Sequence, residues 1–583
     1  MTADVRGMLM GIAVSEGMVV GPAFLVHPMS AEFPSYPIHL EDVEGELSRF
    51  RVALEDAERE IRDLLTGMSD PSDSVAREVL ETHVLVVSDH SLIAQVTKRL
   101  RTELRNVEEV YFKVVEEFAE RLMSMDDDLF RERALDFRDV GHRVLRAFKG
   151  GDAMVVRLPE SPCIVIAKEL RPSEVVGFDR RRVLGVATEV GGRTSHAAII
   201  ARSLGIPMVV GVHGLCSAVT VGRDIFLDGA TGEVGLEVDD ELRRRVQEEI
   251  ERRTRERALL DGIRVERAVT RDGFHVVLAA NMETVAEVEA VRNSGAEGVG
   301  LFRTEFLYLE KNGLPEEEEQ FCVYRTVADA MHPCPVVLRT LDLGGDKMLE
   351  SKMFAEESNP FLGLRAIRLC LRNEEMFRQQ LRAMVRVAKE REVRIMYPMV
   401  TTVEEVRAAN SVLDSVRADL GFEGDIKVGA MIEVPSAAIC ARSIAREVDF
   451  LSIGTNDLVQ YVMAADRLNE SVAYLYQPAH PAVVRLVEMT ARAAAEEGIP
   501  VGICGESAGD LLLTPLFLGL GITGLSVGAA LVPRVKAAVR ALDRRECQDL
   551  RGAFLDCESQ QEVMRLTESV AQRSYGELLV RGA

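Results

Sequence analysis

Residues 427–457 read KVGAMIEVPSAAICARSIAREVDFLSIGTND and contain two short apolar runs, KVGAMIEV and FLSIGTND. Both runs are rich in small and apolar residues, and each closes on polar residues that include a carboxylate. That carboxylate is Glu433 in the first run and Asp457 in the second. Short apolar runs of this kind are typical of buried strands. The stretch therefore predicts two buried strands, each followed by chemically active side chains.

The same pattern repeats through the whole C-terminal half. Helical patterns such as VEEVRAANSVLDSVRADLG separate most of the apolar runs. Eight strands that alternate with helices over about 270 residues predict a (β/α)8 barrel of the TIM type. The eight runs are HVVLAAN (275–281), GVGLFRTEF (298–306), VVLRTLDLG (336–344), RIMYPMV (394–400), KVGAMIEV (427–434), FLSIGTND (450–457), PVGICGE (500–506) and ITGLSVG (522–528).

Candidate catalytic or binding residues lie at the ends of five of these eight runs. Catalytic residues of such barrels lie at the C-terminal ends of the strands. A polar residue that recurs at the same strand end indicates a functional site, because structural charges have no reason to choose that end repeatedly. The residues concerned are Arg303 and Glu305, Arg339 and Asp342, Glu433, Asn456 and Asp457, and Cys504 and Glu506.

The chemistry of this ring suggests a ligand. Two carboxylates, Glu433 and Asp457, repel each other unless a cation or arginines compensate them. Mg²⁺ prefers oxygen ligands and often takes one or two carboxylates together with substrate oxygens. Arginines bind anionic groups with paired hydrogen bonds. We therefore expect a metal-assisted site for a phosphorylated and carboxylated small molecule, with a purely structural rim of salt bridges as the alternative. The arginines are Arg303, Arg339, Arg365 and Arg467.

The N-terminal part has a different organisation. β-like runs occur in residues 11–26 and again from 151 to 236, and together they predict a compact α/β domain. Residues 38–148 are rich in Glu, Arg, Leu and Val at helical spacing, so they predict a helical bundle inserted into that domain or packed on it. The charged run 237–263 predicts a solvated helix that links the two halves.

A second candidate site lies in GGRTSHAAIIARSLGIPMVVG (191–211). Thr194 or Ser195 can cap a helix that starts there, which places His196 in the first helical turn. The free N–H groups of a helix N-terminus favour a negative group, so a phosphoryl group on this imidazole would be stabilised. A structural histidine is the alternative.

Cys504 lies between glycines in GICGE, at a predicted strand end. A free cysteine is most often a small buried apolar residue. At the mouth of a barrel, a thiol can instead donate a proton to a carbanion or an enolate. Both interpretations remain open from the position of Cys504 alone.

Composition excludes several classes of protein. The chain has 583 residues, 94 acidic and 70 basic, with a net charge of −24. This charge argues against a nucleic-acid-binding role, which requires clustered Lys and Arg. No apolar run approaches the length of a membrane span, so we expect no membrane insertion. Nine scattered cysteines without a CxxC pair fit a reducing cytoplasm better than a disulfide scaffold.

Seven motifs, in order, resemble Enzyme I of the bacterial phosphotransferase system, a phosphoenolpyruvate–protein phosphotransferase family. The resemblance covers nearly the whole chain, including GIAVSEG near the N-terminus. One departure is Leu364, where the family often has an aromatic residue. The motifs are GGRTSHAAIIARSLGIP, GAEGVGLFRTEFLYL, VVLRTLDLGGDK, NPFLGLRAIR, MIEVPSAA, FLSIGTNDLVQYVMAADRLN and GICGESAGD.

The resemblance implies roles for the candidate residues. His196 matches the histidine that takes the phosphoryl group from phosphoenolpyruvate, and Cys504 matches the acid that protonates the enolate to pyruvate. Glu433 and Asp457 match the Mg²⁺ ligands. The positions that bind phosphoenolpyruvate are matched by Arg303, Arg339, Asn456 and Arg467, with Asp457 beside them. Arg365 and Lys347 lie in matching motifs, with less specific roles.

The resemblance also implies partners and a domain plan. The phosphoryl group passes from His196 to a histidine of the small carrier HPr, and the barrel forms a homodimer in the cytoplasm. The implied parts are a phosphohistidine domain (1–37 and 149–236), an α-helical HPr-binding insertion (38–148), a linker helix (237–263) that acts as a hinge or a strut, and the phosphoenolpyruvate-binding barrel (264–583).

Three other interpretations compete with this one. A pyruvate-phosphate dikinase or phosphoenolpyruvate synthase shares the barrel and the histidine domain, but it also needs an ATP-binding domain, and no Gly-rich phosphate loop precedes His196. The nitrogen-related branch of the family would use a paralogue of HPr. A regulatory scaffold would bind partners without phosphoryl transfer.

Overall fold

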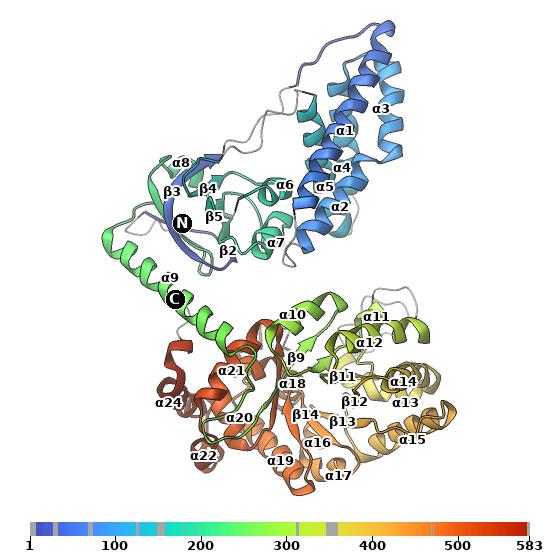
Figure 1. Cartoon of the computed structure of the whole chain (residues 1–583), viewed down its shortest axis with the longest axis vertical. Helices are drawn as coiled ribbons and strands as arrows, with labels where there is room; N and C mark the ends of the chain where they lie inside the picture. Colours follow the sequence, from blue (N-terminus) through green and yellow to red (C-terminus); the bar gives the residue numbers. More distant parts are fainter. Residues whose placement is uncertain are drawn as a thin grey trace. The chain divides into compact units, whose positions relative to one another are not determined.

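The computed structural model describes residues 7–26, 33–67, 74–123, 128–148, 158–179, 181–193, 195–309, 314–344, 359–467, 469 and 471–579. The chain forms two compact units that divide between Thr254 and Arg255. This point lies inside helix α9 (Asp240–Ile263), so one continuous charged helix runs from the first unit into the second (Figure 1). The predicted linker helix is thereby confirmed as a helix.

The first unit contains an eight-stranded sheet with the strand order β1-β8-β7-β3-β4-β5-β6-β2. The predicted pair of strands in residues 11–26 is confirmed as β2 and β3. Helices α6 (Pro172–Val176), α7 (His196–Ser203) and α8 (Leu215–Ala218) lie between later strands. The strands are β1 (Met8–Met10), β2 (Ile12–Ser15), β3 (Met18–Val26), β4 (Cys163–Ala167), β5 (Val183–Thr188), β6 (Met208–Val210), β7 (Asp224–Asp228) and β8 (Glu233–Gly235).

One short segment joins both ends of this sheet. Strands β1 and β2 are separated by Gly11 alone, yet β1 pairs with β8 and β2 pairs with β6. The backbones approach closely here, because the N–H of Gly11 donates to the carbonyl of Gly232 at 2.9 Å. A Cβ at Gly232 would lie 2.4 Å from the carbonyl oxygen of Gly11, so only glycine fits there. Residues 8–15 thus connect the two ends of the sheet in the domain that carries α7.

Five α-helices of the described residues lie between β3 and β4 in the chain, as expected for an insertion, and they pack side by side (Figure 1). Their shared core is fully buried and includes Phe50, Leu80, Val96 and Val114. Helix α2 also contacts α7. The helices are α1 (Val43–Gly67), α2 (Ser74–Val87), α3 (His90–Glu103), α4 (Val107–Met123) and α5 (Asp128–Ala147).

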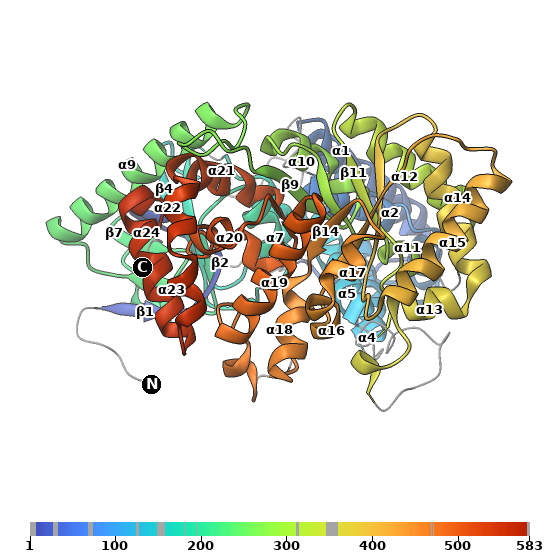
Figure 2. The same ribbon diagram turned by 90° about the horizontal axis from the view of Figure 1, so that it is seen from below.

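The second unit contains a closed barrel of eight parallel strands, which confirms the predicted (β/α)8 fold. Helices cover the outside of the strands (Figures 1 and 2). The strands are β9 (Val277–Met282), β10 (Val299–Phe302), β11 (Val336–Arg339), β12 (Val393–Tyr397), β13 (Lys427–Ile432), β14 (Phe450–Ile453), β15 (Val501–Ile503) and β16 (Gly524–Gly528).

Helices alternate with these strands along the chain. Three further helices follow the last of the alternating ones, namely α22 (Arg544–Asp549), α23 (Arg551–Asp556) and α24 (Gln560–Leu579). The alternating helices are α10 (Val288–Ser294), α11 (Phe306–Leu309), α12 (Glu317–Met331), α13 (Ala366–Arg372), α14 (Glu374–Ala388), α15 (Val403–Asp419), α16 (Pro435–Ile439), α17 (Ala441–Ala445), α18 (Thr455–Met463), α19 (Pro481–Glu497), α20 (Thr514–Leu520) and α21 (Val532–Ala541).

Apolar side chains form a separate small cluster of strand residues in the barrel. Leu301, Val337, Met396, Met431 and the strand-end residue Cys504 pack together there. A second and much larger cluster joins the strands to the helices. The strands are therefore buried on both faces, which explains their nearly continuous apolar sequences. No helix of the described residues combines the length and apolarity needed to cross a membrane.

The strands are shorter than the apolar runs that predicted them. Strand β13 ends at Ile432 and β14 ends at Ile453, so Glu433 and Asp457 lie just beyond their strands. Gly454 follows β14 and is the N-cap of α18, which places Asn456 and Asp457 in a first helical turn. The catalytic candidates are thus held by the loops and helix starts after the strands.

Candidate active site

A buried ion pair lies at the end of strand β11. Arg339 is the last residue of β11, and its Nη2 lies 2.5 Å from Oε1 of Glu305. Its Nη1 lies 3.0 Å from Oδ2 of Asp342. All three side chains are buried. Burial alone would lower the pKa of Arg339, but the two carboxylates raise it above its ordinary value, so the guanidinium stays charged.

Arg365 extends this pair into a chain of alternating charges. Its Nη2 lies 2.9 Å from Oδ1 of Asp342 and 3.1 Å from Oδ2 of Asp457. Its Nη1 donates to the hydroxyl of Tyr461 at 3.3 Å, and that hydroxyl donates to the carbonyl of Phe361 at 2.6 Å. One guanidinium therefore connects the loop after β11 to helix α18.

Glycine makes room for this arrangement. Gly344 has a φ of +136°, and a Cβ at this position would lie 2.1 Å from Cβ of Arg365. A second close approach occurs at Gly454, where a Cβ would lie 2.6 Å from Oε2 of Glu433. Any larger residue at either position would displace a charged side chain of the site.

Glu433 and Asp457 are both buried, at 3% and 7% exposure. Burial, followed by the neighbouring carboxylates of Asp457 and Asp342, raises the pKa of Glu433 to about 8. Two carboxylates that disfavour each other's charge in this way suit a divalent cation, which removes the repulsion. No cluster of three or more His, Cys, Asp or Glu side chains among the described residues could hold a metal alone. The donor set therefore fits an ion such as Mg²⁺ that takes its remaining ligands from a substrate or water.

Backbone strain gathers around the same residues. Four non-glycine residues have positive φ in the described part of the chain, and three of them flank the site. Met399 (φ +55°) donates its N–H to Oε1 of Glu433 at 2.5 Å, Ala366 (φ +52°) follows Arg365, and Ala464 (φ +51°) ends helix α18. Strain of this kind persists where surrounding contacts enforce it, and it is common at functional sites.

Three buried polar atoms of the charge chain have no hydrogen-bond partner among the described residues. They are Oε2 of Glu305, Nε of Arg339 and Nε of Arg365. Buried polar groups are usually satisfied, so an unsatisfied set within one cluster indicates a place where a polar ligand completes the bonding.

The other predicted binding residues have partners outside this chain of ion pairs. Arg303 follows β10 and pairs with the carboxylate of Glu283. Asn456 donates to Oε1 of Glu506 at 3.2 Å and accepts the N–H of Glu506 at 3.0 Å. The positive charge of Arg467 acts on the hydroxyl of Tyr476, whose net pKa of about 12 is set mainly by burial.

Cys504 follows β15 and is 3% exposed. Burial raises the pKa of its thiol to about 11, and the charge of Glu433 adds to this effect. Its Sγ lies 3.6 Å from the carbonyl oxygen of Ile453. The thiol is therefore fully protonated at neutral pH, as a proton donor must be.

His196 is the first residue of helix α7, in the first unit. Of the two predicted capping residues, Ser195 is the N-cap, and its hydroxyl accepts the N–H of Ala198 at 3.3 Å. Thr194, Lys347 and the side chain of His196 lie outside the described residues. The predicted placement of His196 in a first helical turn is confirmed for the backbone.

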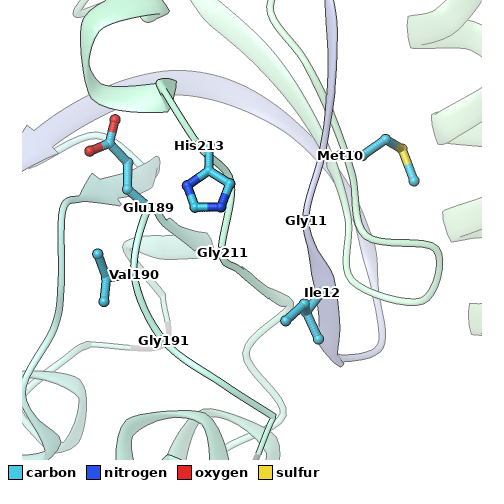
Figure 3. Close-up of a pocket in the computed structure, with 8 residues that line it drawn as sticks. All are labelled: Met10, Gly11, Ile12, Glu189, Val190, Gly191, Gly211 and His213. Atoms are coloured by element: carbon cyan, nitrogen blue, oxygen red, sulfur yellow. The ribbon is translucent and has the colours of Figure 1, made fainter. Parts of the chain in front are cut away.

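An open cavity of about 490 Å³ lies beside the turn that leads to α7 (Figure 3). Met10 and Ile12 line it from the β1–β2 segment, and Glu189 and His213 line it from the opposite side (Figure 3). Val190, Gly11, Gly191 and Gly211 complete the lining. Its surface carries one carboxylate and one imidazole, so it lacks the arginines that characterise the site in the barrel.

Comparison with known proteins identifies the family. Three family models match, described as the N-terminal part (residues 10–133), the mobile domain (159–232) and the PEP-binding domain (257–544) of PEP-utilising enzymes. The chain is 40% identical over 566 residues to the phosphoenolpyruvate-protein phosphotransferase of Priestia megaterium, which covers 96% of this chain and 98% of that protein.

The chain belongs to the phosphoenolpyruvate-protein phosphotransferases. A second relative from Staphylococcus carnosus (strain TM300) is also 40% identical, and the match covers 97% of this chain and 99% of the relative. A solution structure of Enzyme I (nEIt) is 34% identical and covers 42% of this chain and 98% of its own, with a TM-score of 0.36.

This phosphotransferase is accordingly an enzyme that uses phosphoenolpyruvate, as the motifs predicted. Members of the PEP-utilising family need a divalent metal ion. The buried carboxylates of Glu433 and Asp457 fit that requirement.

Several residues around the site were not predicted. Tyr461 contacts Arg365 and lies four residues after Asp457, so the helical spacing placed both on one face of α18. Glu283 pairs with Arg303 and also follows a strand end, at β9. Nothing local to Met399 indicated that its N–H binds Glu433, because this contact joins separate loops.

Proposed function

We propose that this phosphotransferase binds phosphoenolpyruvate at the mouth of the barrel and transfers its phosphoryl group to His196. The observation that carries the proposal is the buried chain Glu305–Arg339–Asp342–Arg365–Asp457, in which both guanidinium groups keep an unsatisfied Nε. A doubly charged phosphate and a carboxylate are the groups that such arginines bind best.

The proposed binding groups are of two kinds, buried arginines and more exposed residues. Arg339 and Arg365 are held rigidly by carboxylates, so they meet the substrate without losing side-chain freedom. Arg303 and Arg467 are more exposed and complete the site from its rim, together with the amide of Asn456. This arrangement neutralises a substrate that would otherwise be repelled by a chain of net charge −24.

In the transfer step, the imidazole of His196 attacks phosphorus. A nitrogen–phosphorus bond forms, and the bond between phosphorus and the enol oxygen breaks with its electron pair on that oxygen. The resulting enolate takes a proton at its methylene carbon from the thiol of Cys504, which gives pyruvate. The thiol regains its proton from water. The pKa of about 11 keeps this proton on Cys504 until the enolate forms.

We assign the divalent metal to Glu433 and Asp457 and identify it as Mg²⁺. When bound, Mg²⁺ neutralises charge on the phosphoryl oxygens and orients them. Glu433 is already oriented by the N–H of Met399, and Asp457 by Arg365. These two contacts hold the carboxylates in place before a cation or a substrate arrives.

The second half of the reaction needs a protein that accepts the phosphoryl group. We propose a histidine-containing carrier of the HPr type that docks on helices α1–α5. The contact between α2 and α7 supports this proposal, because a protein bound to the helical insertion would lie close to the helix that begins at His196.

The domain plan follows from these roles. We propose residues 1–37 and 149–236 as the phosphohistidine domain, 38–148 as the carrier-binding domain, 237–263 as the linker and 264–583 as the substrate-binding barrel. His196 and the arginines belong to different compact units, and we propose from the family resemblance that His196 swings between the barrel and the carrier. A homodimer through the barrel and a cytoplasmic location remain predictions from the family resemblance.

The test is a transfer assay with labelled phosphoenolpyruvate, Mg²⁺ and an HPr-type carrier. We expect one labelled carrier for each pyruvate formed, without ATP. A strict requirement for ATP, or pyruvate without any labelled carrier, would contradict the proposal.

The matched variants are His196→Ala and His213→Ala, both in the first unit. We expect His196→Ala to abolish transfer and His213→Ala to retain it. A His196→Ala variant that binds the carrier and still transfers the label would assign the reaction to another residue.

A further inference from the structure

We propose that Gln380 is a positioning residue that holds Arg339 in its substrate-binding orientation. Gln380 lies on α14, outside the ring of strands, and is 1% exposed. Its hydrogen bonds go to Leu341, Thr304 and Tyr324 and not to the charged groups, so its role would act through the backbone of the two loops that carry the charge chain. The inference rests on the proposed role of Arg339.

The first contact of Gln380 is with the loop after β11. Its Oε1 accepts the N–H of Leu341 at 2.9 Å. Leu341 lies between Arg339 and Asp342, the two residues of this loop that take part in the ion pairs. One hydrogen bond thus fixes the backbone midway between an arginine and the carboxylate that orients it.

The second contact reaches the loop after β10. Nε2 of Gln380 donates to Oγ1 of Thr304 at 3.1 Å, and Oγ1 of Thr304 donates to the carbonyl oxygen of Arg339 at 3.0 Å. Thr304 directly precedes Glu305, the other carboxylate that binds Arg339. A single amide therefore ties together the segments on both sides of the Glu305–Arg339 pair.

The direction of each hydrogen bond is determined by the network. Nε2 of Gln380 also donates to the hydroxyl of Tyr324 at 3.2 Å, and this hydroxyl donates to Oε1 of Gln320 at 3.0 Å. With Leu341 donating to the amide oxygen, the amide of Gln380 has only one consistent orientation. All four side chains of the network, including Thr304, are at most 1% exposed, so water does not replace a lost bond.

This arrangement makes Gln380 more than a buried structural residue. Catalytic and binding groups must be held to within a fraction of an ångström, and supporting hydrogen bonds supply that constraint. Gln320 offers the comparison that separates the two roles. It shares the network and is equally buried, but its amide bonds the hydroxyls of Tyr308 and Tyr324 and the carbonyl of Pro315 instead of Thr304 or Leu341.

The test compares the variants Gln380→Met, Thr304→Val, Thr304→Ser and Gln320→Met by steady-state kinetics and thermal unfolding. We expect Gln380→Met and Thr304→Val to lower kcat/KM for phosphoenolpyruvate on the order of tenfold, mainly through KM. Thr304→Ser keeps the hydroxyl and should restore most of the loss. Gln320→Met makes the same chemical change as Gln380→Met and should lower Tm like the others, yet keep kcat/KM within about twofold.

Two results would overturn the inference. If Gln380→Met and Thr304→Val both keep the wild-type kcat/KM, the amide of Gln380 does not position Arg339. A loss in Gln320→Met as large as in Gln380→Met would show a general effect of stability. Thr304→Val changes few atoms and serves as the decisive variant if Gln380→Met does not fold. Arg339→Met is measured beside them, because retained activity there would refute the proposed role of Arg339 itself.

Discussion

The carboxylate of Glu433 accepts a 2.5 Å hydrogen bond from the backbone N–H of Met399. Met399 adopts a left-handed conformation at this point, which is uncommon for a residue with a side chain. The loop after β12 therefore holds a carboxylate that follows β13. The contact fixes Oε1 of Glu433 and leaves its second oxygen, close to Gly454, for another ligand.

The first prediction concerns the pH dependence of metal binding. Glu433 has a pKa of about 8, so it is protonated at pH 6 and 7 in the metal-free enzyme. A cation binds the carboxylate form and must displace this proton. The apparent affinity for Mg²⁺ should therefore rise by up to about tenfold per pH unit below pH 8 and level off above it.

Calorimetry in buffers with different ionisation enthalpies checks this prediction, because it counts the released protons. The variant Glu433→Gln should release none. Mg²⁺ binding by the wild-type enzyme that does not change between pH 6 and 8 would contradict the assignment of Glu433 as a ligand.

A second prediction tests the bridge made by Arg365. The variant Arg365→Lys keeps the charge but loses the planar fork that contacts Asp342, Asp457 and Tyr461 together. We expect kcat/KM for phosphoenolpyruvate to fall by roughly 10²-fold, since a misplaced binding group can cost that much. Initial rates of pyruvate formation provide the measurement.

Arg368→Lys is the matched control for this change. Arg368 lies one helical turn further along, and its guanidinium contacts the carbonyls of Leu362 and Gly363 and the hydroxyl of Thr401. Equal losses in the two variants would show that the effect belongs to the loop and not to the bridge.

The third prediction concerns the protonation of the enolate. Cys504→Ala removes the proposed acid, so pyruvate formation should slow by about 10²-fold or more, the usual contribution of such a group. Phosphorylation of the protein should then run ahead of pyruvate formation in rapid-quench experiments. In the wild type, the activity should show no fall from loss of the Cys504 proton until the pH approaches 11.

Cys440→Ala is the control, because Cys440 is exposed and lies at the end of α16, outside the strands of the barrel. If Cys504→Ala releases pyruvate at the wild-type rate, the thiol is only a packing residue of the barrel.

A fourth prediction follows from the pair Arg303–Glu283. The carboxylate of Glu283 pairs with the guanidinium of Arg303, which we assign to substrate binding. Glu283 therefore competes with the phosphate of the substrate for this guanidinium. Glu283→Gln should lower KM for phosphoenolpyruvate. The side chain of Glu283 is 58% exposed and that of Arg303 is 34% exposed. Exposed ion pairs contribute up to about 1 kcal/mol, so KM should decrease by about two- to fivefold.

Salt provides a second measurement of the same effect. The difference between Glu283→Gln and the wild type should shrink as ionic strength rises, because exposed charges are screened. Glu289→Gln, at an exposed position on α10, should leave KM unchanged. An increase of KM in Glu283→Gln would show that Glu283 orients Arg303 for binding.

The sequence predicted the barrel and most of the charged site for a physical reason. Parallel strands buried on both faces must be apolar, so a charged residue such as Arg339 or Glu433 at the end of a run stands out. The helix start at His196 was also predictable, because Ser195 is a capping residue followed by an apolar helical face.

Contacts between distant segments could not be predicted in the same way. Gln380 looks like an ordinary residue of an amphipathic helix, yet it binds Leu341, which lies 39 positions away in the chain. Tyr461 and Met399 likewise act on residues of other loops. Their contributions depend on the register of neighbouring strands, which no single local pattern encodes.

The central claim is that His196 carries the phosphoryl group taken from phosphoenolpyruvate. The most direct measurement incubates the full chain with Mg²⁺ and phosphoenolpyruvate labelled in its phosphoryl group, and then locates the label by mass spectrometry under alkaline conditions. We predict an acid-labile phosphoryl group on His196, formed together with one pyruvate and absent in His196→Ala. A label on any other residue, or none in the wild-type protein, would contradict the account.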